Sequence, residues 1–294
     1  MSSDKRRLRH ATLAVWVSVA ATAYLSPTVL AQGHTDATST TPTGIATNWS
    51  AGVWRSASLE DNSSESFFFS GYKAGASFGE DAYEDPDGKW TNPPPLTPKY
   101  LARYNEIRRA AFDGRNTYDQ GANCSPLGIP YMTGFGVMEI LFKPGQITMI
   151  YEEDGGVRRI FTDGRPHPAP KDLIPGYNGH SIGHWEGKTL IVDTVGLRDD
   201  TYIEPGMPHS SQLHVIERWR QTGPDELTNT VVLIDPEVFT KPWGTTWHWK
   251  RHRDWSINEV FCVNSRDAKV NGATTMLGPD GQPLLGPNQR PEPR

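Results

Sequence analysis

The sequence predicts a mainly β protein folded as an antiparallel up-and-down barrel. Eight short runs alternate apolar or β-branched residues with polar ones, as half-buried strands do: residues 137–142, 147–152, 157–161, 190–194, 213–219, 227–234, 245–250 and 257–263. Turn-forming Gly, Pro and Asp separate most of the runs, so neighbouring strands are expected to pair in sequence order. Closure into a barrel would remove the exposed edges of such a sheet. A two-sheet β-sandwich is the alternative.

The composition agrees with a globular chain of short elements. Of 294 residues, 36% are hydrophobic and 21% are charged, and the 28 glycines and 24 prolines favour turns over long helices. A net charge of -5 gives no electrostatic reason to expect a nucleic-acid partner. The chain has no GxGxxG, P-loop or CxxC pattern, so dinucleotide binding, P-loop chemistry and thioredoxin-like chemistry are not expected.

The first 31 residues have the pattern of a signal peptide. Basic residues at positions 5, 6, 7 and 9 precede an apolar run over 11–25, and Val29-Leu30-Ala31 fits a cleavage site. The run is shorter than the about 20 residues that a membrane span needs, so cleavage is expected rather than a retained anchor or stable membrane insertion. The mature protein is expected in the periplasm or secreted, beginning with a flexible linker over residues 32–47.

Three further segments are expected after the linker. Residues 48–123 are interpreted as a loop-rich cover containing one helix at about residues 98–112, which begins after Thr97. Residues 124–265 hold the barrel, and residues 266–294 form a C-terminal tail rich in Gly and Pro. Cys124 and Cys262 are expected to form one disulfide in an oxidising compartment, with two buried free thiols as the alternative.

The candidate site is the stretch 179–218, which contains four of the nine histidines. An imidazole titrates near neutral pH and can move a proton when a carboxylate orients it. The expected catalytic histidines are His180, His209 and His214, with Asp193 or Glu217 as the orienting carboxylate, although alternation places His214 and Glu217 on opposite faces of a strand. A metal held by the three histidines is a less favoured alternative. Histidines that only hydrogen-bond loops and turns are the structural alternative.

A pocket of mixed polar and aromatic character is expected beside these histidines. The predicted strands 213–219 and 245–250 carry polar and aromatic residues on both faces, which a dry core would not tolerate, so one face is expected to line a cavity in the barrel. Arg159 and Arg165 are candidates to hold an anionic group or an oxyanion. The residues expected to contact the ligand are Arg159, Tyr177, Trp185, Trp247 and His248.

Several motifs together resemble a large family of exported proteins from Gram-negative bacteria, most of which have no assigned activity. They are RRIFTDGRPHP at 158–168, GHS at 179–181, WEG at 185–187, TLIVDTVG at 189–196, PHS at 208–210, LHVIER at 213–218 and FTKPW at 239–243. The resemblance spans about residues 120–265. It implies an exported protein with a pocket that contains His180, His209 and His214, and it supports the disulfide. His184 and Lys188 depart from the family's Arg and Asp, which puts a role for His184 in doubt.

The expected function is that of a periplasmic enzyme that uses histidine-assisted acid–base chemistry on a small, partly apolar molecule bound in the barrel. The reaction would be that of a lyase, isomerase, cyclase or a hydrolase without a covalent serine. One alternative is a lipocalin-like binding protein without turnover, and another is a metalloenzyme with histidine ligands. No cofactor is expected except a divalent metal in the last case. A small molecule is the expected partner.

Overall fold

The computed structural model describes residues 37–38, 40–57, 93–112, 125–134, 136–153, 156–204, 206–258, 266–270 and 273–277. For residues 37–38, 108–112 and the last two ranges, only the backbone is described. The expected signal peptide, Cys124 and Cys262 lie outside the described residues, so export and the disulfide stay predictions. Within the described part, no helix is long and apolar enough to cross a bilayer.

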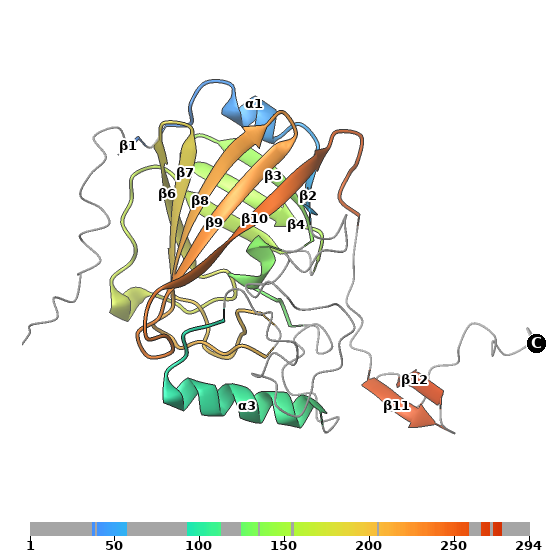
Figure 1. Cartoon of the computed structure of the whole chain (residues 1–294). Coiled ribbons are helices and arrows are strands. Elements are labelled where there is room, and N and C mark those ends of the chain that lie inside the picture. The colour runs from blue at the N-terminus through green and yellow to red at the C-terminus, as the bar shows by residue number, and fades with distance from the viewer. Residues whose placement is uncertain are drawn as a thin grey trace, which may run out of the picture. The chain divides into compact units, whose positions relative to one another are not determined.

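Nine strands form a closed barrel, which confirms the predicted barrel over the sandwich alternative (Figure 1). Around the barrel the order is β6-β5-β4-β3-β2-β10-β9-β8-β7, and pairing of β7 with β6 closes it. Because the barrel is closed, each of these strands has a neighbouring strand on both sides. The strands are β2 (Val53–Ser56), β3 (Val137–Lys143), β4 (Gln146–Tyr151), β5 (Val157–Phe161), β6 (His180–Glu186), β7 (Thr189–Val195), β8 (His214–Gly223), β9 (Glu226–Ile234) and β10 (Trp243–His252).

The barrel is mixed rather than wholly antiparallel, which corrects the predicted up-and-down order. β5 and β6 pair in parallel, with Ile160 opposite Ser181 and Phe161 opposite Ile182. Parallel neighbours need a crossover between them. Residues 162–179, here called the crossover segment, connect the end of β5 to the start of β6 and include a short 3₁₀ turn at Pro170–Asp172.

Two strands of the barrel were not predicted. β2 has only four residues and lies in the part interpreted as a loop-rich cover. β6 reads HSIGHWE, in which polar histidines and a glycine hide the alternation of apolar residues. For the last predicted strand, over 257–263, residues 257 and 258 are not in a strand and the others lie outside the described residues.

The predicted helix is confirmed, because α3 spans Pro98–Phe112. The amide of Leu101 donates to the carbonyl of Thr97 at 2.9 Å, which closes the first turn. The Thr97 hydroxyl instead donates to the carbonyl of Glu237 at 3.0 Å, so it ties the helix to the connection between β9 and β10. Tyr100 and Tyr104, which are four residues apart, form the buried face of α3.

Parts of the expected linker and tail have regular structure. Within the linker range, Ala37–Thr38 form β1, which pairs with the end of β6, and α1 begins at Ile45 and ends at Trp49. Ile45 and Trp49 are both buried, so α1 is packed into the core. Within the tail range, β11 (Arg266–Val270) and β12 (Ala273–Leu277) form an antiparallel hairpin. A further 3₁₀ turn spans Tyr131–Thr133.

Alternate residues of the barrel strands point inward and form a packed core. Large rings dominate it, and all of them are almost fully buried: Trp54, Trp185, Trp219, Trp247 and Trp249. Together with aliphatic side chains from every barrel strand except β2, β6 and β10, they form one continuous hydrophobic cluster. The described inward side chains therefore pack against one another in a core. The ligand cavity expected inside the barrel stays a prediction.

A buried ion pair lies within this core. The side chains of Arg158 on β5 and Glu217 on β8 are both 0% exposed, and the Arg158 Nη1 donates to Glu217 Oε1 at 3.1 Å. A second contact joins Arg158 Nη2 to Glu217 Oε2. Buried charges are tolerated when they are paired and hydrogen-bonded. The other partners of the two groups, each on a barrel strand, include Tyr151, Ser181, Thr194, Trp219 and Asn229.

Candidate functional site

On the outer face of the same strands, His167, His180, Asp193 and His214 form what we call the histidine–aspartate cluster. His180 and His214 are the first residues of β6 and β8, and Asp193 lies on β7 between these two strands. Alternation places these three side chains outside because their neighbours Ser181, Thr194 and Val215 face inward. His167 comes from the crossover segment.

A glycine allows the crossover segment to enter β6 directly before His180. Gly179 has a φ of +56°, in the left-handed region that glycine adopts without strain. A Cβ atom at this position would lie 2.5 Å from the carbonyl oxygen of Val195 on β7. Any other residue would therefore push β6 and β7 apart next to His180 on β6 and close to Asp193 on β7.

One carboxylate oxygen of Asp193 joins two imidazoles. His167 Nε2 lies 3.1 Å from Asp193 Oδ1, and His214 Nε2 contacts the same oxygen. His167 Nδ1 in turn lies 2.8 Å from His180 Nδ1. The side chains of His167, Asp193 and His214 are 19%, 34% and 26% exposed, so a small molecule can reach them although water only partly surrounds them.

These hydrogen bonds determine which ring nitrogens carry protons when the histidines are neutral. The ionised Asp193 only accepts, so His167 and His214 each donate an Nε2–H to it. His167 Nδ1 is then an acceptor, and His180 donates its Nδ1–H to it. The lone pairs that remain are on His180 Nε2 and His214 Nδ1. Among the described residues, neither of these two nitrogens has a hydrogen-bond partner.

The same contacts shift the pKa values of Asp193 and His180. Burial alone would raise the pKa of Asp193, but the hydrogen bonds and charges of His167 and His214 outweigh it and hold that pKa far below its ordinary value. Burial lowers the pKa of His180, and the nearby charges of His167 and Arg165 lower it further. Asp193 is therefore ionised and His180 is neutral at pH 7.

Phe161 and Arg165 cover one side of His180. The Phe161 ring stacks on the His180 ring with centroids 5.4 Å apart, and the Arg165 guanidinium lies 4.0 Å from the centroid of Phe161. Asp163 holds Arg165 through Nε at 2.9 Å and Nη2 at 2.6 Å. The third nitrogen, Arg165 Nη1, has no hydrogen-bond partner in the described part of the chain. Arg165 is thus fixed in position with one donor group to spare.

Acidification is expected to destabilise the fold. The pKa of His180 and that of the buried His209 are lowered, mainly by burial, and the pKa of Asp193 is lowered by its two histidines. The unfolded chain then binds protons that the folded chain does not bind, first on the histidines below about pH 6.5 and then on Asp193 below about pH 4. The urea midpoint, followed by tryptophan fluorescence at constant ionic strength, should fall as the pH is lowered from about 6.5 and should fall further below about pH 4. His209→Gln should make the histidine part of this fall shallower, and a midpoint that rises on acidification contradicts the prediction.

The structure brings together three of the five residues predicted as catalytic, namely His180, Asp193 and His214. His209 is buried in the loop between β7 and β8, where its Nε2 lies 2.8 Å from Thr201 Oγ1 and its Nδ1 lies 2.9 Å from the carbonyl oxygen of Ser210. It therefore hydrogen-bonds its own loop, as the structural alternative predicts. Glu217 faces the barrel interior and binds Arg158, so it does not orient His214.

The predicted ligand contacts are dispersed. Trp185 and Trp247 belong to the packed core. Arg159 and His248 are exposed on the outer faces of β5 and β10. Tyr177 is half-buried on the crossover segment, and the guanidinium of Arg198 lies 5.0 Å from its ring centroid. Of these five residues, Tyr177 is the one that shares a segment with His167.

Two side chains were missed from the sequence. His167 stands between two prolines, well before the histidine-rich stretch, and no local pattern links it to Asp193. The other is Arg158, which alternation with the apolar Ile160 assigns to the inner face, whereas Arg159 faces outward. That alternation was the available signal for the buried ion pair.

Residues 179–183 read Gly-His-Ser-Ile-Gly, which matches the GxSxG pattern of serine hydrolases. In those enzymes the serine lies exposed on a turn between a strand and a helix. Here Ser181 lies within β6 and is buried. Its hydroxyl binds Arg158 Nε at 3.2 Å and Thr194 Oγ1 at 2.9 Å, so it is part of the core network and not a nucleophile.

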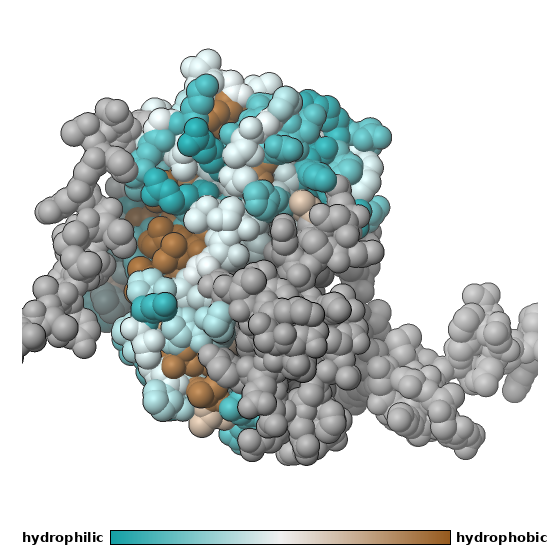
Figure 2. Space-filling model, viewed as in Figure 1, coloured by the Kyte–Doolittle hydropathy of each residue, from teal (hydrophilic) through white to brown (hydrophobic). Residues whose placement is uncertain are grey.

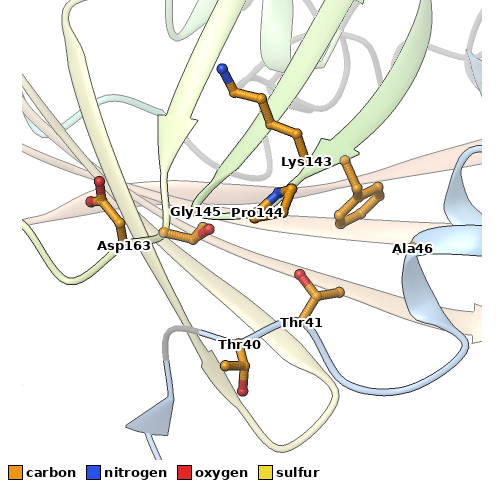
Figure 3. A pocket seen from close by; sticks show the side chains of 9 residues that line it. Thr40, Thr41, Ala46, Lys143, Pro144, Gly145 and Asp163 are labelled. Carbon is orange, nitrogen blue, oxygen red and sulfur yellow. The ribbon is translucent and has the colours of Figure 1, made fainter.

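A pocket of about 530 Å³ is lined by Asp163, among other residues. Figure 3 shows Asp163 beside the β3–β4 turn, with the Thr41 side chain pointing toward that turn. No histidine of the cluster lines this pocket. The carboxylate of Asp163 connects the two regions because it also holds Arg165.

The alternative metal ligands are not grouped as that hypothesis required, since His209 binds Thr201 and Ser210. Among the residues with described side chains, no three His, Cys, Asp or Glu are arranged to hold a metal ion.

No protein-family model, curated protein or solved structure matches the chain. The fold and the site therefore define the class alone: a mainly β protein with a closed mixed barrel of nine strands and a histidine–aspartate cluster on its outer face. The resemblance to exported bacterial proteins stays a prediction.

Proposed function

We propose that this protein is an enzyme that catalyses proton transfer on a small molecule bound at the histidine–aspartate cluster. The observation that supports this most is Asp193, which binds His167 and His214 through one oxygen and reaches His180 through His167. A carboxylate that orients an imidazole is a recurring acid–base device. The reaction is that of a lyase, isomerase, cyclase or non-serine hydrolase, and the expected location is the periplasm.

His180 Nε2 is the proposed base. When it takes a proton, the new imidazolium donates from Nδ1 to His167, and the negative charge of Asp193 stabilises it through that ring. His214 Nδ1 is the second proton carrier. Its protonated form donates its Nε2–H to Asp193, which stabilises the charge, and gives the Nδ1 proton to the product.

A binding protein without turnover explains the site less well. A lipocalin-like binder holds its ligand in the barrel interior, whereas the inward residues here form a packed core. Binding alone also gains nothing from a carboxylate shared by two imidazoles with a third imidazole attached. Acid–base catalysis uses each of these groups.

Solvent deuterium provides a test that does not require the substrate to be known. The purified protein is incubated in D2O with a panel of carbonyl compounds, esters and cyclic ethers, and mass spectrometry records conversion or deuterium uptake. We expect at least one compound to react, and His180→Ala to slow its reaction by about 100- to 10,000-fold, the usual contribution of a general base.

His184→Ala is the matched control. His184 lies on the same outer face of β6, and its Nε2 is 3.6 Å from Glu186 Oε1 rather than in contact with the cluster. This variant should react like the unmodified protein. A panel in which nothing reacts, or a reaction that survives His180→Ala unchanged, contradicts the proposed function.

A further inference from the structure

The outer face beside Asp193 is apolar. Ile182 on β6 and Ile216 on β8 stand directly opposite Asp193, and Val232 on β9 stands opposite Ile216. All three aliphatic side chains are half-buried, and we call them the apolar strip. Strands lie about 4.8 Å apart, so the strip spans roughly 14 Å across the barrel wall. Figure 2 shows apolar surface in the region where Figure 1 draws β6 to β8.

The polar end of the strip carries a guanidinium on one side. Arg165 lies over Phe161, which stacks on His180, and Asp163 keeps the guanidinium there. The charge of Arg165 acts on His180, because it helps to lower the pKa of that imidazole. Arg165 Nη1 still has donor capacity for an oxygen close to His180.

We infer that the substrate is amphipathic, with an oxygen-bearing acidic group at His180 and Arg165 and an aliphatic or aromatic body along the apolar strip. This inference rests on the proposed function. In the first step a C–H or O–H bond of the substrate breaks and its proton goes to His180 Nε2. The electron pair moves onto the substrate oxygen, which accepts a hydrogen bond from Arg165 Nη1. Apolar contacts along the strip hold the rest of the molecule.

The strip belongs to the substrate rather than to another partner because it is continuous with the cluster. Asp193 lies within the line of the strip, between Ile182 and Ile216, so any molecule that covers these side chains also covers the proposed catalytic groups. A second copy of the chain on this surface would block the cluster.

Simple amphiphiles test this inference directly. Protein with ¹³C-labelled isoleucine methyl groups is titrated with octanoate, acetate or octylammonium, and methyl and imidazole NMR signals are recorded. Octanoate should shift the Ile182, Ile216 and His180 signals saturably. Acetate lacks the apolar body and octylammonium lacks the negative charge, so each should bind at least roughly tenfold more weakly.

Three variants assign the two parts of the site. Arg165→Gln and Ile216→Ser should each weaken octanoate binding roughly tenfold or more. Leu141→Ser is the control, because Leu141 is an exposed aliphatic residue on β3, separated from β6 by β4 and β5. It should bind octanoate like the unmodified protein.

If octanoate does not shift the Ile182 and Ile216 methyl signals, the inference is wrong. Equal binding of all three probes also contradicts it. Methyl shifts that depend on protein concentration without any probe would assign the strip to a second copy, which also overturns it. The deuterium experiment tests the proposed function separately. If a hydrophilic compound reacts and His180→Ala abolishes that reaction, the proposed function stands and the amphipathic substrate class is wrong.

Discussion

Replacement of Glu217 by Leu will lower the free energy of unfolding by about 3–5 kcal/mol, which is the usual cost of removing one partner of a buried ion pair. The Arg158 guanidinium is 0% exposed and would keep its charge without a carboxylate. Its other partners, the hydroxyls of Tyr151, Ser181 and Thr194, are neutral. The loss is a large share of the roughly 5–15 kcal/mol that stabilises a typical domain. Urea denaturation followed by tryptophan fluorescence measures it.

The double variant Arg158→Met/Glu217→Leu separates the effect of charge from that of packing. It removes both charges and keeps similar side-chain volumes, so most of the lost stability should return. Glu217→Gln keeps an acceptor for Trp219 and Asn229 and should lie between the two. If Glu217→Leu alone stays within about 1 kcal/mol of the unmodified protein, water reaches Arg158 and the closed interior described above is wrong.

Asp193→Asn is expected to slow the reaction found in the deuterium panel by about 100- to 10,000-fold. The amide keeps the shape of the carboxylate but not its charge, so neither a His180 nor a His214 imidazolium is stabilised when it forms. An amide also offers N–H groups that favour the wrong tautomer of His167. Proton transfer to His180 would then lose both the carboxylate charge that stabilises the imidazolium and the hydrogen bonds that set the tautomer of His167.

Nitrogen-15 NMR of the imidazoles checks the same point without substrate. In the unmodified protein His180 should be protonated on Nδ1 and His167 on Nε2, and Asp193→Asn should disturb both assignments. Glu186→Gln is the matched control, since it removes a carboxylate from the same outer face that binds His184 and Arg218 instead. Turnover above half of the unmodified value in Asp193→Asn would remove Asp193 from the mechanism.

Alternation and turn signals were enough to predict most of the barrel. Strands such as Val157–Phe161 and the helix Pro98–Phe112 lie where local patterns place them. Alternation also correctly separated His214 from Glu217. The missing strand β6 and the parallel pairing with β5 are not local properties. They depend on the crossover segment, whose path is set by contacts with residues far along the chain.

The candidate site was only partly predictable for the same reason. His180, Asp193 and His214 fall on three successive strands of the antiparallel part, so sequence order brings them together. His167 joins them only because the crossover segment returns along the outside of the barrel. His209 was overestimated, since a histidine count cannot distinguish an imidazole that reaches solvent from one that holds a loop.

On β6, β7 and β8, neighbouring residues have different roles because they lie on opposite faces of the sheet. Ser181, Thr194 and Val215 belong to the interior, while the residues just before them carry the proposed chemistry. Mutations at the outward positions can therefore alter specificity with little loss of stability, whereas inward ones can alter stability without touching a substrate. Such a division makes the barrel a favourable starting point for directed evolution, because libraries confined to outward positions should yield mostly folded variants.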